Sequence, residues 1–200
     1  ESIAARYLQA LGHEAEMPED GYLGDYVTDL AKEVVHREGE RYLDMEPEER
    51  VEYFTKVAKE SVMAGQKKDL ANFNVVHDVW FEESSLFADS AVDKALERLK
   101  AGGHTYEAEG ALWLRSSDYG DEKDRVLVRS NGNPTYLAAD AAYHYNKFER
   151  GFDKVIDIWG PDHHGYVART KAVVQALGFD ADRLEIIIHQ IVRLFAGGEM

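Results

Sequence analysis

The sequence has 200 residues, of which 44% are hydrophobic and 30% are charged, and its formal net charge is −15. No apolar run approaches the ~18 residues of a membrane-spanning helix, and so acidic a surface repels phosphate backbones; we therefore expect no membrane insertion and little nucleic-acid binding by this chain itself. The absence of cysteine excludes disulfides and thiolate metal sites, which fits a reducing compartment, and we expect a cytoplasmic protein.

The first hundred residues are predicted to be mainly helical. Apolar residues recur at helical spacing in two groups: Tyr26, Leu30, Val34, and then Val51, Phe54, Val57, Ala58, Val62. Pro47 suits the first turn of the second helix. Ser90, followed by Asp93, resembles a capping box that opens a helix over residues 92–100, and Gly102 ends it. Residues 18–24 are turn-like and are expected to link two modules.

After Gly103 the pattern changes to short strands. Residues 111–115 and 125–129 alternate as strands do, with a charged loop at residues 118–124 between them. Asn131-Gly132 predicts a tight turn after the second strand.

The last third of the chain predicts a parallel arrangement. A helix over residues 137–148 precedes a strand at 155–159, a helix at 166–177 that Gly178 stops, and a strand at 184–191. A strand, a helix and a strand with short connections form a βαβ unit, which implies parallel strands and a right-handed crossover. Ligands of such sheets bind beyond the carboxyl ends of the strands.

Tyr136, Asp140 and His144 are spaced by four residues, so on one helix their side chains share a face. A guanidinium stacks on an aromatic ring and donates two parallel hydrogen bonds to a carboxylate. The alternative is a helix that packs Tyr136 inward and leaves Asp140 solvated.

Polar residues also follow both predicted parallel strands. Asp162-His163-His164 comes after the first and can supply metal ligands, acid–base groups or contacts to a nucleotide, with one histidine facing the site while the other caps the next helix. His189-Gln190 ends the second strand and could meet an adenine edge. A purely structural role is the alternative for both groups.

Seven ordered runs resemble arginyl-tRNA synthetases. They are residues 18–22 (PEDGY), 78–82 (DVWFE), 110–113 (GALW), 118–127 (DYGDEKDRVL), 130–144 (SNGNPTYLAADAAYH) with Lys147-Phe148, 152–154 (FDK) leading to 159–166 (WGPDHHGY), and 189–194 (HQIVRL). Because they occur in the family's order over nearly the whole chain, together they are far more specific than any one run.

The resemblance implies an α/β fold, part of a Rossmann-like class I catalytic domain: a βαβ half with parallel strands, plus a helical and small antiparallel β insertion. Residues 1–24 would come from its first half, 25–130 would be the connective insertion, and 131–200 the second half. It implies arginine binding by Tyr136, Asp140, His144 and His163. It implies nucleotide binding by Gly160, Asp162, His189, Gln190 and Val192.

The implied enzyme activates arginine with ATP and Mg²⁺ to an adenylate and then esterifies its tRNA, with no tightly bound metal. The family's His-x-Gly-His and Lys-Met-Ser-Lys signatures, which stabilise the charge that develops during catalysis, do not occur in these residues. We therefore expect an internal fragment of the synthetase that ends just before the second signature, contains no catalytic residue and is inactive alone.

Two other functions remain open from the sequence. Asp162-His163-His164 after an apolar strand is the signature of DHH phosphoesterases, whose metal pair needs further aspartates; the only dense group here is Asp118, Asp121 and Asp124. The other is a non-catalytic, acidic interaction module with synthetase-like architecture.

Overall fold

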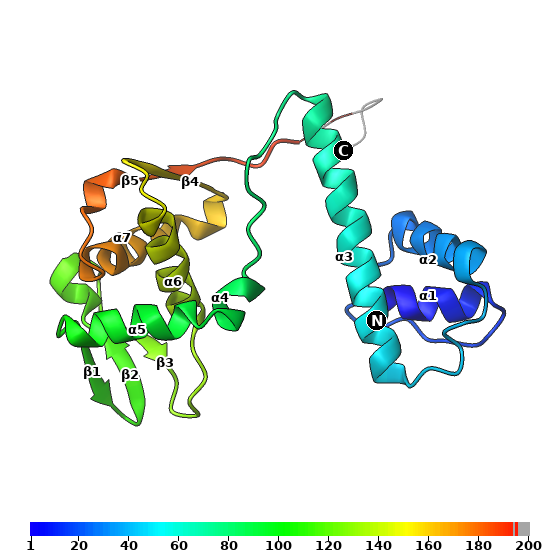
Figure 1. The fold of residues 1–200 in the computed structure, drawn as a ribbon, viewed down its shortest axis with the longest axis horizontal. Coiled ribbons are helices and arrows are strands. Elements are labelled where there is room, and N and C mark those ends of the chain that lie inside the picture. Colours follow the sequence, from blue (N-terminus) through cyan, green and yellow to red (C-terminus); the bar gives the residue numbers. More distant parts are fainter. Residues whose placement is uncertain (194, 196–200) are drawn as a thin grey trace. The chain divides into compact units, whose positions relative to one another are not determined.

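The computed structural model describes residues 1–193 and 195 and forms two compact units, Glu1–Trp80 and Phe81–Met200 (Figure 1). The segment boundaries expected at residues 24/25 and 130/131 fall inside these units, so they stay a prediction. Leu194, the last residue of the run 189–194, lies outside the described residues. In the described part of the chain, no helix combines the length and apolar character needed to cross a bilayer.

The unit Glu1–Trp80 is built from helices α1 (Ser2–Ala10), α2 (Asp25–Glu38) and α3 (Pro47–Asn72). Its core is aromatic: the rings of Tyr7, Tyr42 and Phe54 are all buried and contact one another. The buried Tyr7 hydroxyl donates to the carbonyl of Gly39 at 2.7 Å and accepts the Tyr42 N–H at 3.2 Å, so its polar atom is satisfied.

Two predictions for this unit need correction. Tyr26 is 56% exposed, because Val27, one position further round α2, takes the core-facing place beside Leu30 and Val34. Residues 18–24 connect α1 to α2, which pack together within one unit. Pro47 does begin α3, as predicted.

The second unit begins with α4 (Ser84–Ala88) and α5 (Ala91–Ala101), followed by the antiparallel sheet β1-β2-β3 (Thr105–Ala108, Ala111–Leu114, Arg125–Val128). Strand β1 was not predicted; a hairpin turn through Glu109 and Gly110, both with positive φ, pairs it with β2. The capping box was wrong. Ser90 is left-handed (φ 53°) and makes no side-chain bond to the start of α5, because an N-cap residue needs an extended backbone for that bond.

Helix α6 (Tyr136–Glu149) then packs on α5 and α7 (Val167–Ala176), and the large apolar core of the unit lies among α5, α6, α7 and β2–β3. Strands β4 (Val155–Trp159) and β5 (Leu184–Ile188) are parallel, which confirms the predicted βαβ unit and the α/β class. Gly178 ends α7 with φ +89°, a conformation that favours glycine.

Strand β5 is three residues shorter than predicted. Strand β4 ends at Trp159, whose carbonyl accepts the His189 N–H at 2.8 Å, so β5 has no further pairing partner on β4 beyond that point. One face of the pair covers a small core of Phe148, Val155, Val174 and Leu184. On the other face Ile156 is 52%, Ile158 69% and Ile187 40% exposed.

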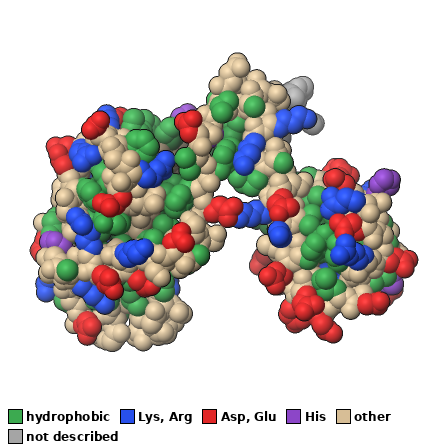
Figure 2. All heavy atoms as spheres, viewed as in Figure 1, with side chains coloured by type: hydrophobic (Ala, Val, Ile, Leu, Met, Phe, Trp, Pro, Cys, Tyr) green, Lys and Arg blue, Asp and Glu red, His purple; other side chains and the backbone are tan. Residues whose placement is uncertain are grey.

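The acidic charge is spread over both units. On the face drawn in Figure 2, red carboxylate side chains lie over both of them, with blue lysines and arginines interspersed. This distribution matches the net charge of −15 and forms no continuous basic path on this face of the kind that follows a phosphate backbone.

Candidate functional site

The start of helix α6 is fixed to strand β3, and this positions the predicted recognition residues. The side chain of Thr135, the residue before the helix, accepts no hydrogen bond from it. Its hydroxyl donates to the carbonyl of Val126 at 2.9 Å, and the Thr135 N–H donates to the carbonyl of Leu127 at 2.8 Å. Leu127 is fully buried. The N-terminal part of α6, which bears Tyr136 and Asp140, is therefore anchored to the core of the unit.

Tyr136 and Asp140 have the opposite environments to those of the structural alternative. The Tyr136 side chain is 82% exposed, whereas Asp140, one helical turn further on, is partly buried. Among the described residues no donor is hydrogen-bonded to the Asp140 carboxylate. An exposed ring beside a carboxylate without a protein partner is the pair of groups that a guanidinium needs.

Charged neighbours act on the pKa of Asp140. Burial raises this pKa above its ordinary value, and the carboxylate of Glu83 adds to the rise. Lys147, and His144 and His163 when they are protonated, act in the opposite direction and favour the ionised form. A bound guanidinium would add a further positive charge and favour that form more strongly.

His144 follows Asp140 by one turn of α6 and is only 3% exposed. Its Nδ1 is 2.8 Å from the backbone oxygen of Asp140, and its Nε2 is 2.7 Å from Oδ2 of Asp157. Direct contact with arginine would require one of these hydrogen bonds to break. That predicted contact stays a prediction.

Asp157 and Lys147 were not recognised from the sequence. Lys147 Nζ donates to Oδ1 of Asp157 at 2.5 Å, so the buried carboxylate pairs with two partners from α6. Burial works to raise the pKa of Asp157, but the hydrogen bonds from His144 and Lys147 hold it below its usual value. The alternation of β4 could have revealed it, because Asp157 falls on the same face as Val155, where an apolar residue is expected.

The parallel register brings the polar strand ends together. Trp159 pairs with Ile188, so residues 160–164 and 189–190 leave the same edge of the β4–β5 pair. In this group Asp162, His163, His189, Gln190 and Val192 are all exposed, and Gly160 is partly buried. A Cβ at Gly160 would lie 2.6 Å from Oδ1 of Asp162, so a side chain there would displace that carboxylate.

The two adjacent histidines differ, but neither caps a helix. The ring of His163 lies between those of Trp159 and Tyr166, with centroids at 5.9 and 5.5 Å, and its Nε2 is 3.4 Å from Oδ2 of Asp162. His164 is exposed. Helix α7 begins after Tyr166 without a side-chain cap, so the predicted histidine cap is wrong.

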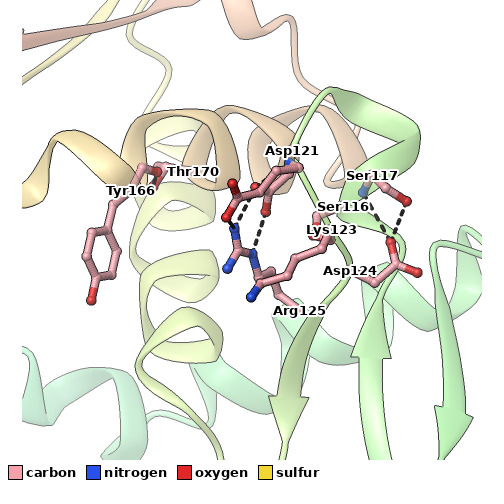
Figure 3. A network of polar contacts seen from close by, with 9 residues as sticks. Ser116, Ser117, Asp121, Lys123, Asp124, Arg125, Tyr166 and Thr170 are labelled. Atoms are coloured by element: carbon pink, nitrogen blue, oxygen red, sulfur yellow. Dashed lines mark hydrogen bonds and ion pairs between the residues drawn. The ribbon is translucent and has the colours of Figure 1, made fainter.

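Two of the three aspartates in the loop 118–124, Asp121 and Asp124, form hydrogen bonds that hold the loop (Figure 3). Asp121 binds Arg125 through two hydrogen bonds of 2.7 and 2.8 Å, and Asp124 accepts from the N–H and hydroxyl of Ser117 at 3.1 and 2.6 Å. Over residues 1–193 and 195, no group of three or more His, Cys, Asp or Glu could hold a metal ion. The loop therefore does not supply the aspartate cluster of a metal-dependent phosphoesterase.

We expect the purified chain to contain no stoichiometric manganese and to have no phosphodiesterase activity. The reason is that two of the loop aspartates already have protein donors, and that among residues 1–193 and 195 the exposed Asp162 has His163 as its one ion-pair partner. Elemental analysis after incubation with manganese and desalting provides the measurement. A metal pair per chain that Asp162→Ala removes would restore the phosphoesterase hypothesis.

The comparisons with known proteins agree with one another. A family model for the catalytic domain of class I tRNA synthetases (R) matches residues 19–198. Arginine–tRNA ligases of Carboxydothermus hydrogenoformans and Moorella thermoacetica are 51% and 50% identical over the whole of this chain. The chain spans 36% of the length of each, about a third of these curated relatives.

Solved structures show the same relationship. A Campylobacter jejuni protein assigned as an arginyl-tRNA synthetase is 42% identical, with a TM-score of 0.88 over 99% of this chain and 43% of its own. The Thermus thermophilus arginyl-tRNA synthetase is 20% identical, with a TM-score of 0.63 over 94% of this chain and 39% of its own, a likeness of fold.

Proposed function

This chain belongs to the family of class I arginyl-tRNA synthetase catalytic domains, and on that premise we propose that it provides the arginine-recognition part of an arginine–tRNA ligase. The enzyme would activate arginine with ATP to an adenylate and then transfer the arginyl group to its tRNA. The observation that carries the proposal is the exposed Tyr136 ring one turn from the partly buried Asp140 carboxylate.

Each part of the site would have its own task. Asp140 would accept two hydrogen bonds from the guanidinium, Tyr136 would stack on its plane, and His163 would lie beside the amino acid. His144, with both ring nitrogens bound inside the protein, would support these groups from below. Asp140 would thus recognise the charge of the guanidinium, and Tyr136 its planar shape.

The strand ends would hold the nucleotide. Gly160 and Asp162 after β4, and His189, Gln190 and Val192 after β5, emerge at one edge, where ligands of parallel sheets bind. Magnesium would arrive with ATP as part of the substrate, and we assign no resident metal. The tRNA would be contacted mainly by other surfaces, because this chain is acidic, and the protein would work in the cytoplasm.

The 200-residue chain alone is expected to show no arginine-dependent ATP–pyrophosphate exchange above background, with or without tRNA. Its residues include neither a His-x-Gly-His nor a Lys-Met-Ser-Lys run to stabilise the charge that builds up on the phosphates. A full-length enzyme that carries these residues should show exchange in the same assay. Robust exchange by the chain alone would contradict the proposal that catalysis requires these two signatures.

A further inference from the structure

Four charged groups of alternating sign connect helix α6 to strand β4. Asp140 is linked through its backbone oxygen to Nδ1 of His144, and Nε2 of His144 reaches Asp157, which also binds Lys147. His144 and Asp157 are 3% and 6% exposed, so these interactions are shielded from water. The proposed function does not use Asp157, although a buried carboxylate is costly unless its pairing serves the fold or the site.

The partners of His144 determine where its protons are. A backbone carbonyl oxygen only accepts, so Nδ1 carries a hydrogen. Asp157 accepts from Lys147, and its pKa is lowered, so it is an ionised carboxylate that also only accepts. Nε2 therefore carries a hydrogen as well, and in this geometry His144 is a cation.

We propose that Asp157 is a positioning residue for arginine recognition: it holds His144 as an oriented cation, and His144 in turn fixes the main chain of Asp140 and keeps its carboxylate ionised. This inference rests on the proposed function, because it assigns how the guanidinium-binding carboxylate of that site is prepared.

The surroundings of Asp140 explain why such support is needed. Burial and the carboxylate of Glu83, from the residue before α4, both favour the neutral acid, which could offer a guanidinium only a weaker acceptor. The groups that oppose them are His144 and Lys147 on α6 and, when it is protonated, His163 after β4. Two of these three are held in place by the Asp157 carboxylate, from the strand below.

Asp157→Asn in a full-length enzyme that carries this chain tests the proposal. The amide keeps the volume of the carboxylate and can donate to a His144 that has lost the hydrogen on Nε2, so packing is retained while the positive charge is lost. The KM for arginine should rise roughly ten-fold, the loss of about one hydrogen bond to a charged group, while kcat and the KM for ATP stay within about two-fold. Asp153→Asn, an exposed aspartate just before β4, is the matched control and should change nothing.

A double variant separates positioning from a general effect on packing. If Asp157 acts through Asp140, the change Asp157→Asn should add little to the arginine KM of an Asp140→Asn enzyme, because neighbouring residues that act on one interaction are not additive. His144→Gln, which retains a donor but not the charge, should reproduce the arginine-specific defect and decides the matter if Asp157→Asn does not fold.

The outcomes are distinct. An unchanged arginine KM in Asp157→Asn and His144→Gln, with a clear defect in Asp140→Asn, would overturn this inference and leave the proposed function standing. Equal losses for arginine and ATP, or additive effects in the double variant, would also overturn it, because they indicate a structural role alone. No defect in Asp140→Asn would instead overturn the proposed function.

Discussion

Asp140→Asn, made in a full-length enzyme that carries this chain, is expected to weaken the use of arginine by about 2–5 kcal/mol, the usual cost of removing one side of a buried charged pair. That is roughly thirty-fold to several-thousand-fold in kcat/KM for arginine. Asparagine keeps the volume but removes the charge, and its amide faces the guanidinium with a donor where an acceptor is required. Steady-state kinetics with arginine and with ATP as the varied substrate provide the measurement.

The comparison with Tyr136→Ala sharpens this prediction. Stacking on a guanidinium is weaker than the ion pair, so this variant should lose only about 1–2 kcal/mol, again with arginine and not with ATP. Because the Tyr136 side chain is 82% exposed, Tyr136→Ala should not disturb folding, and a loss of arginine use would reflect the lost contact. If Asp140→Asn left both the KM and the catalytic efficiency for arginine within about two-fold of the unmodified enzyme, α6 would not be the arginine-reading helix.

Asp121→Ala is expected to destabilise the unit Phe81–Met200 by about 3–5 kcal/mol, because it leaves the Arg125 guanidinium without its main partner. The side chains of Asp121 and Arg125 are 2% and 13% exposed, so water cannot replace the lost bonds well. Hydrogen exchange of the β2 and β3 amides as a function of urea measures this unit separately from the other. Asp118→Ala, an exposed aspartate of the same loop, is the control and should have little effect.

The same pair gives the effect a definite dependence on pH. The hydrogen bond from Arg125 holds the pKa of Asp121 below its usual value, against the effect of burial. The stabilisation is therefore complete above the pKa of the unfolded chain, about 3.9, and is lost as the pH falls below it through the lower folded value. The difference in the free energy of unfolding between the unmodified chain and Asp121→Ala should therefore disappear in strong acid. A difference that persisted unchanged there would mean that Asp121 acts through packing and not through its charge.

Periodic segments were the predictable part of the fold. Helix α6 and strand β4 follow from apolar spacing. The parallel pairing of β5 with β4 follows from the short connections of a βαβ unit. The failed predictions depend on single backbone conformations: the left-handed Ser90 removed a cap, and the positive-φ turn at Glu109 and Gly110 paired the unpredicted strand β1 with β2. Neither conformation can be inferred from the spacing of side chains.

In the site, the sequence indicated Tyr136 and Asp140 through their spacing on one helix, but it could not show that one is exposed and the other partly buried. The hydrogen bonds of Asp157 with His144 and Lys147 were not predicted, because they form only when β4 packs against α6. An acidic residue on the apolar face of a strand is nevertheless visible in a sequence, and here it marked a buried pair.

The two cores of the second unit differ in size, and this sets how firmly each half of the site is held. Helix α6 belongs mainly to the large core, whereas the β4–β5 pair rests on a small one and exposes isoleucines on its other face. Local opening is cheapest where few apolar contacts must be broken, so the strand ends should open more often than the helix. The arginine half would then be preformed, whereas a nucleotide would spend part of its binding free energy on ordering β4 and β5, and its binding would reduce their fraying.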